Sequence, residues 1–181
     1  AKGARAASAA VGAPSPTPMP RSEAVPLPGQ SGPMTRDLTE AAHRGALQEA
    51  TGRDDEMFEV LQILSRKTKN NVMLVGEAGV GKTQIVEGLA LRIAKEGKSG
   101  GMPPFRILEL NIATLMTGTQ YRGAFEEKVL ALIEQVKRSE NAVLFIDEVH
   151  LIMGAGATDG DGMDLANLLK PELSRGEFRC I

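Results

Sequence analysis

Residues 72–83 read VMLVGEAGVGKT, an apolar run that leads directly into a glycine-rich segment. From Gly76 onward the stretch fits the pattern G-x-x-x-x-G-K-[ST], and it stands between a predicted strand at 72–75 and a predicted helix. This context favours a phosphate-binding P-loop over a glycine turn that binds nothing. We expect a nucleotide to contact the loop and the residue after it: Gly76, Glu77, Ala78, Gly79, Val80, Gly81, Lys82, Thr83 and Gln84.

The loop contains the groups that bind ATP and Mg²⁺. Glycines let backbone N–H groups surround the phosphates, and the N-terminus of the following helix adds a partial positive charge. Lys82 is expected to reach the β- and γ-phosphates, and Thr83 to offer its hydroxyl to Mg²⁺. ATP and Mg²⁺ are therefore the predicted cofactors.

Two acids, Asp147 and Glu148, directly follow an apolar run at 143–146. A carboxylate at the carboxyl end of a buried parallel strand lies at the ligand-binding edge of the sheet. We expect Asp147 to bind Mg²⁺ and its waters, and Glu148 to polarise the attacking water. Alone, the pair would more simply be an acidic turn. Beside a P-loop it predicts ATP hydrolysis, with Lys82, Asp147 and Glu148 as the catalytic residues.

Strand-like and helix-like segments alternate along residues 35–181, which predicts an α/β fold with a parallel sheet and helices on both faces. Strands are expected at 72–75, 105–112, 142–146 and 178–181. Helices are expected at 35–45, within 51–71, after the P-loop, at 124–138 and at 163–174, where Pro171 is a candidate break.

Residues 1–34 differ in composition from the rest, because they hold most of the ten prolines and are otherwise mainly Ala, Gly and Ser. Such a segment buries too little surface to offset its ordering entropy, so we interpret it as a flexible linker, with a transit segment as the alternative. The net charge of −2 gives no general attraction to nucleic acid or anionic membrane. The single cysteine, Cys180, excludes an internal disulfide framework and suits a reducing, cytoplasmic location.

Several motifs occur together in the order of one protein family. The chain resembles the first ATPase module of the Clp unfoldases, the AAA+ proteins that include ClpA, ClpB and ClpC. The resemblance implies a P-loop NTPase with a three-layer αβα sandwich, of which 35–181 form the N-terminal part, incomplete at the C-terminus. It rests on LTEAAHRG (38–45), GRDDEM (52–57), GEAGVGKTQIVEGLA (76–90), GTQYRGAFEEKV (118–129), LFIDEVH (144–150) and NLLKPELSRGE (167–177).

In the Clp family, the segment like GTQYRG is a loop that projects into the channel of a hexameric ring. The resemblance implies that Tyr121, with Arg122 and Gly123, contacts a polypeptide substrate in a homo-hexamer. Glycines on both sides of the tyrosine are expected to let this loop move. The glycine-rich stretch at 154–162 is similar to a second pore-facing loop, and a plain connector remains the alternative there.

The implied function is ATP binding and hydrolysis that drive the unfolding and translocation of polypeptides, as in a chaperone, a disaggregase or a protease-associated unfoldase. A peptidase or co-chaperone is a possible further partner, whereas nucleic acid and membrane are not expected. The alternative is an AAA+ ATPase that remodels a type VI secretion sheath or loads a protein onto nucleic acid. The short "SRKTK" run (65–69) is the only basic cluster that would support a nucleic-acid role.

One departure from the family concerns the adenine contact. The family usually has an Asp-Pro-Val-Ile run before Gly-Arg, whereas this chain reads LQEATGR at 47–53. The resemblance places Thr51 and Gly52 against the adenine, although Thr51 is smaller than the family's apolar residue.

Overall fold

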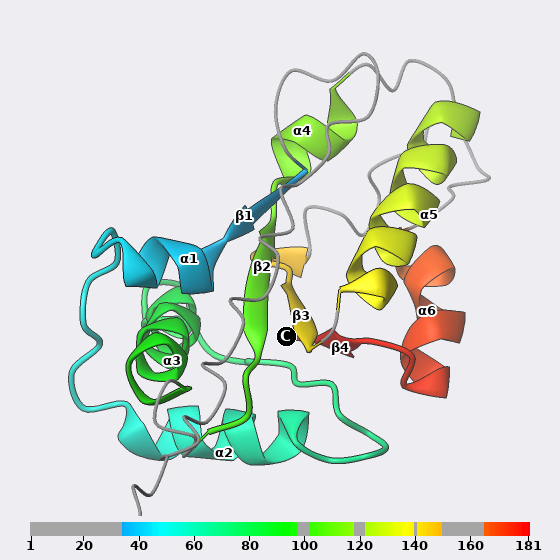
Figure 1. Ribbon diagram of the computed structural model, residues 1–181. Helices are drawn as coiled ribbons and strands as arrows, with labels where there is room; N and C mark the ends of the chain where they lie inside the picture. Colours follow the sequence, from blue (N-terminus) through cyan, green and yellow to red (C-terminus); the bar gives the residue numbers. More distant parts are fainter. Residues whose placement is uncertain (1–33, 98–101, 118–121, 140, 150–164) are drawn as a thin grey trace, which may run out of the picture.

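The computed structural model describes residues 34–97, 102–117, 122–139, 141–149 and 165–181. A four-stranded sheet in the order β1-β2-β3-β4 lies at the centre of these residues (Figure 1). Its strands are β1 (Thr35–Asp37), β2 (Arg106–Leu110), β3 (Ala142–Phe145) and β4 (Arg179–Cys180). Strands β2, β3 and β4 run parallel, as the sequence predicts.

Side chains of the parallel strands alternate between the two faces of the sheet. The register pairs Ile107 with Val143 and Leu108 with Leu144. The first pair lies in one apolar cluster and the second pair in another. Because all four side chains are buried, both faces of the sheet need a cover of helices.

Helices supply that cover on both sides (Figure 1). On one face lie α1 (Leu38–His43), α2 (Asp54–Leu64) and α3 (Lys82–Glu96), and on the other lie α5 (Arg122–Arg138) and α6 (Leu165–Arg175), while α4 (Ile112–Met116) directly follows β2. Helix α3 packs through Val86, Leu89 and Ala90, none of which is exposed. The predicted apolar stripe of α5 is also buried: Phe125, Val129, Leu132, Ile133 and Val136. The three-layer αβα arrangement is confirmed.

The sheet is mixed rather than purely parallel, because β1 pairs antiparallel with β2. The helix predicted at 35–45 was wrong at its start, because residues 35–37 form a strand. Asp37 instead has an extended backbone and caps α1, accepting from the Glu40 N–H at 2.9 Å. The Asp37 carboxylate also pairs with Arg106 of β2, so the side chain that caps the start of α1 also ties β1 to the sheet.

The expected strand at 72–75 does not form. This segment lies beside β4 through a backbone hydrogen bond of 2.9 Å from the Val72 N–H to the Cys180 carbonyl. Met73 and Val75 are 75% and 87% exposed, so the run is not the buried strand that its composition predicts. An apolar run becomes a central strand only where neighbours pair with it on both sides, and within the described ranges only β4 lies beside it.

Two helix boundaries also differ from the prediction. Pro171 does not break α6, which continues to Arg175 and ends where Gly176 adopts a left-handed backbone with φ +67°. The missing N–H of Pro171 leaves the Asn167 carbonyl without its helical donor, and Asn167 is exposed to water. Helix α5 begins at Arg122, so Gly123 lies in its first turn and is not a hinge there.

At Gly88, α2 and the segment before it approach α3 closely. A Cβ at this position would lie 2.8 Å from Met57 Sδ and 2.9 Å from Ala50 Cβ. Because real Cβ atoms do not approach other atoms so closely, only glycine lets these elements pack at this distance.

We predict that Gly88→Ala lowers the free energy of unfolding by ~1–3 kcal/mol, because the methyl group overpacks the contact with Met57 and Ala50. Chemical denaturation of the full-length protein measures this change. Gly97→Ala is the matched control, since no atom lies within 4 Å of a Cβ there and its φ is −59°. Equal stabilities of the two variants would show that the close contact at Gly88 does not constrain the packing.

Candidate functional site

The P-loop takes its shape from two glycines with left-handed backbones. Gly79 has φ +79° and Gly81 has φ +92°, a region that L side chains rarely adopt. Gly81 is also the N-cap of α3, so the helix starts at Lys82 with its free N–H groups at the loop. In this way the sequence G-V-G-K-T turns the chain sharply and points a helix N-terminus at the place expected for phosphate.

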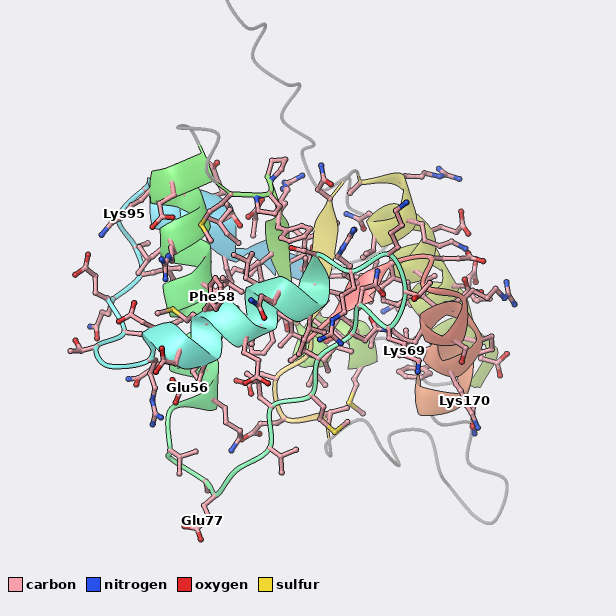
Figure 2. The ribbon with its side chains drawn as sticks, turned by 90° about the horizontal axis from the view of Figure 1, so that it is seen from below. Glu56, Phe58, Lys69, Glu77, Lys95 and Lys170 are labelled. Atoms are coloured by element: carbon pink, nitrogen blue, oxygen red, sulfur yellow. The ribbon has the colours of Figure 1, made fainter. Side chains whose placement is uncertain are left out.

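The ammonium group of Lys82 is bound by the loop itself. Lys82 Nζ donates to the Gly76 carbonyl at 3.0 Å and to the Glu77 carbonyl at 2.8 Å. Phosphate oxygens are stronger acceptors than neutral carbonyls, so they can replace these two partners. Figure 2 shows the Glu77 side chain at the tip of the loop, directed away from the rest of the chain.

Thr83 and Asp147 bring the P-loop and the acidic pair together. Thr83 Oγ1 donates to Asp147 Oδ2 at 2.9 Å, although the two residues are far apart in sequence. The second carboxylate oxygen, Asp147 Oδ1, accepts from the Glu148 N–H at 2.9 Å. Both oxygens of Asp147 are thus fixed, and a hydroxyl and a carboxylate meet as two oxygen ligands of the kind that Mg²⁺ takes.

Glu148 follows with an unusual backbone. Its φ of +49° is uncommon for any residue other than glycine and turns the chain away from the line of β3. The Glu148 side chain is exposed, so water can reach its carboxylate directly. The structure therefore places Lys82 and Thr83 at the N-terminus of α3, close to Asp147 and Glu148 at the end of β3.

Arg53 is a polar contact of the loop that the sequence analysis missed. Its Nη2 donates to the Val80 carbonyl at 2.8 Å, and its Nη1 donates to Glu56 Oε1 at 2.7 Å. The hydrogen bond from Arg53 is the main cause that lowers the pKa of Glu56 below its ordinary value. The sequence offered one signal for the Arg53–Glu56 pair, because Arg and Glu three residues apart in GRDDEM can meet on the surface of a helix.

A cavity of about 280 Å³ lies beside the loop, between α2 and the segment 72–75. Arg53, Val80, Lys82 and Ile85 are among its lining residues. Thr51 and Gly52 do not line it and are exposed, as is Gln84. The predicted adenine contact of Thr51 and Gly52 therefore remains a prediction, with Arg53 as the neighbour that does reach the cavity.

The expected pore loop and the stretch 154–162 lie outside the described residues, and so does Tyr121. The described residues that flank this loop are linked, because Lys128 Nζ of α5 donates to the carbonyl of Thr117. Thr117 is the C-cap of α4, and α5 begins at Arg122.

The sequence profile described as "ATPase family associated with various cellular activities (AAA)" matches residues 72–179. The chain belongs to this family. Curated AAA relatives include chaperone protein ClpB 2 of Nostoc sp., which is 52% identical over 147 residues, and chaperone protein ClpB of Staphylococcus epidermidis, which is 50% identical over the same length. The alignments cover 81% of this chain and 17% of each relative, so the chain spans about a sixth of their length.

Solved structures agree with the sequence relatives. The Saccharomyces cerevisiae Hsp104–ADP complex is 38% identical with a TM-score of 0.68, covering 82% of this chain and 20% of that one. A closed state of Hsp104 with ATPγS and casein gives 38% identity and a TM-score of 0.69, covering 81% and 25%. These matches confirm the AAA fold class and the resemblance to the Clp ATPase modules. No helix within the described residues is both long and apolar enough to cross a membrane.

We predict that Lys82→Ala in the full-length protein weakens ATP binding at least tenfold, because the loop loses its charged contact with the phosphates. Titration with a fluorescent ATP analogue measures the dissociation constant. Lys95→Ala is the control, since Lys95 lies near the far end of the same helix, where it pairs with Glu49 (Figure 2). Unchanged affinity of the Lys82 variant would remove the P-loop assignment.

Proposed function

We propose that this chain binds ATP with Mg²⁺ and supplies the residues that catalyse its hydrolysis in the full-length protein. The observation that carries the proposal is the 2.9 Å hydrogen bond between Thr83 and Asp147, because it joins the P-loop to the acidic end of β3. A glycine turn without function would need no such contact with a distant carboxylate. Membership of the AAA family supports the same chemistry.

Each residue of the site has a proposed role. The loop from Gly76 to Thr83 binds the phosphates through its N–H groups, and Lys82 neutralises their charge. Thr83 and Asp147 hold Mg²⁺, which neutralises developing charge on the phosphates when it is bound. Glu148 orients and polarises the attacking water, for which its exposed carboxylate is accessible. Gln84, Thr51 and Gly52 flank the nucleotide.

We further propose that hydrolysis drives the unfolding and translocation of polypeptides through a homo-hexameric ring. ClpB relatives named as chaperones, at 50–52% identity, favour this function over a secretion-sheath or nucleic-acid-loading role. A structure of an Hsp104–casein complex is 37% identical to this chain with a TM-score of 0.66, and the casein in it is a polypeptide ligand. Tyr121, with Arg122 and Gly123, would contact the substrate, and an aromatic ring offers apolar contact that tolerates any sequence.

We predict that Glu148→Gln keeps ATP binding but lowers the hydrolysis rate at least a hundredfold, because the amide preserves the shape and loses the basic oxygen. Phosphate release and nucleotide affinity are measured on the full-length protein. Glu134→Gln, an exposed acid on α5, is the control and should hydrolyse ATP normally. Comparable phosphate release by the Glu148 variant and the unmodified protein would assign the catalytic carboxylate elsewhere.

We predict that Tyr121→Ala leaves ATP affinity and melting temperature nearly unchanged and impairs unfolding of a tagged substrate. The ring would grip the polypeptide and touch no phosphate ligand. Tyr121→Phe keeps the aromatic surface and should retain unfolding activity. If the tyrosine were a core residue, the alanine variant would instead lose roughly 3–5 kcal/mol of stability, and the melting curve would reveal it.

A further inference from the structure

Arg53 connects the P-loop to the first turn of α2. Its guanidinium donates to the Val80 carbonyl through Nη2 and to the Glu56 carboxylate through Nη1, at 2.8 and 2.7 Å. The Arg53 backbone is itself fixed, because its carbonyl accepts from the Met57 N–H at 3.0 Å and Met57 is buried. Arg53 therefore ties the loop at Val80, two residues before Lys82, to a helix whose Met57 is buried in the core.

The Val80 carbonyl belongs to the peptide group that also carries the Gly81 N–H. A trans peptide points its C=O and its N–H in opposite directions, so the direction of the Val80 carbonyl sets the direction of the Gly81 N–H. Gly79 and Gly81, on either side of Val80, have left-handed backbones. The peptide group that joins Val80 to Gly81 belongs to neither a strand nor a helix. A donor that holds the carbonyl outward therefore turns the N–H inward, toward the phosphates.

We propose that Arg53 is a positioning residue for phosphate binding, which holds the Val80 carbonyl so that the Gly81 N–H faces the nucleotide. Glu56 orients the guanidinium for this contact. The proposal rests on the nucleotide-binding function proposed above and adds a residue that acts through the loop without touching the phosphates.

The chemistry of the pair fits this role. The planar guanidinium offers donors in a fixed fork, so it can serve a carbonyl and a carboxylate at once, whereas an ammonium group is a single point of charge. The Glu56 carboxylate is ionised at neutral pH and so accepts a charge-assisted hydrogen bond from Arg53, which lowers the pKa of Glu56 further below its ordinary value. The Arg53 side chain is 39% exposed, which leaves it partly shielded beside the cavity.

The competing explanation is long-range attraction between the Arg53 charge and the phosphates. A substitution at Glu56 distinguishes this charge effect from positioning of the loop. Glu56→Gln removes a negative charge near the loop, so a pure charge effect predicts tighter ATP binding. Positioning predicts weaker binding, because the guanidinium loses the carboxylate that orients it. The opposite signs make this variant the decisive one.

The experiment measures affinity for a fluorescent ATP analogue on the full-length protein. We expect Arg53→Met to bind about tenfold more weakly, Arg53→Lys to recover part of the loss, and Glu56→Gln to bind a few-fold more weakly. The double variant Arg53→Met/Glu56→Gln should bind no more weakly than Arg53→Met alone, because Glu56 acts through Arg53. Arg36→Met, which breaks the Arg36–Glu109 pair of β1 and β2, should bind normally.

Two results would overturn the proposal while leaving the proposed function intact: tighter or unchanged binding by Glu56→Gln, or additive losses in the double variant. Melting temperatures without nucleotide show whether each variant is folded, and the Glu56→Gln test remains valid if Arg53→Met fails to fold. If the unmodified protein does not bind the ATP analogue, both the proposed function and the role of Arg53 are wrong.

Discussion

A hydrogen bond between Thr83 and Asp147 holds the two halves of the site together. It requires that the start of α3 and the end of β3 meet at one edge of the sheet. That meeting depends on the core, because α3 presses Val86 and Leu89 against the face of the sheet that carries Ile107 and Val143. The burial of these apolar side chains thus sets the distance between two polar groups that lie far apart in the sequence.

The loop before α3 is built from groups that restrain each other. Gly79 and Gly81 provide the left-handed turns. Because glycine backbones are conformationally free, the orientation of the Val80–Gly81 peptide has to be fixed by other residues. Lys82 bonds two carbonyls of the loop from within, and Arg53 bonds a third from outside. The loop is therefore pre-shaped for an anion, and binding of a phosphate would exchange the partners of Lys82 without rebuilding the backbone.

The sequence predicted the features that depend on local pattern. The strands within 105–112 and 142–146 and the stripe of α5 were recognised because short apolar runs and helical spacing are properties of the neighbouring residues. The end of the first strand was wrong, since Ile112 begins α4. The position of Asp147 opposite Thr83 also followed, since the topology of a parallel sheet brings strand ends to one edge. These predictions needed no knowledge of distant contacts.

The features that were missed depend on distant partners. Thr35–Asp37 became a strand because β2 offers an open edge and Arg106 binds Asp37, which the local helix signal does not reveal. Residues 72–75 were expected to form a central strand, but they lie beside β4 on one side only within the described residues. An apolar run does not indicate which strands will flank it, so the sequence could not show this. The contact of Arg53 with Val80 spans 27 residues, and only the folded chain brings it about.

The inferred site can be checked in a structure of the full-length protein with Mg²⁺ and a non-hydrolysable ATP analogue. We expect Lys82 Nζ to leave the Gly76 and Glu77 carbonyls for the phosphates, while Arg53 stays bonded to the Val80 carbonyl. Thr83 and Asp147 should remain neighbours and both face the Mg²⁺. A nucleotide bound elsewhere, or a Lys82 that keeps its two carbonyl partners beside a bound nucleotide, would show that the P-loop does not bind phosphate as inferred.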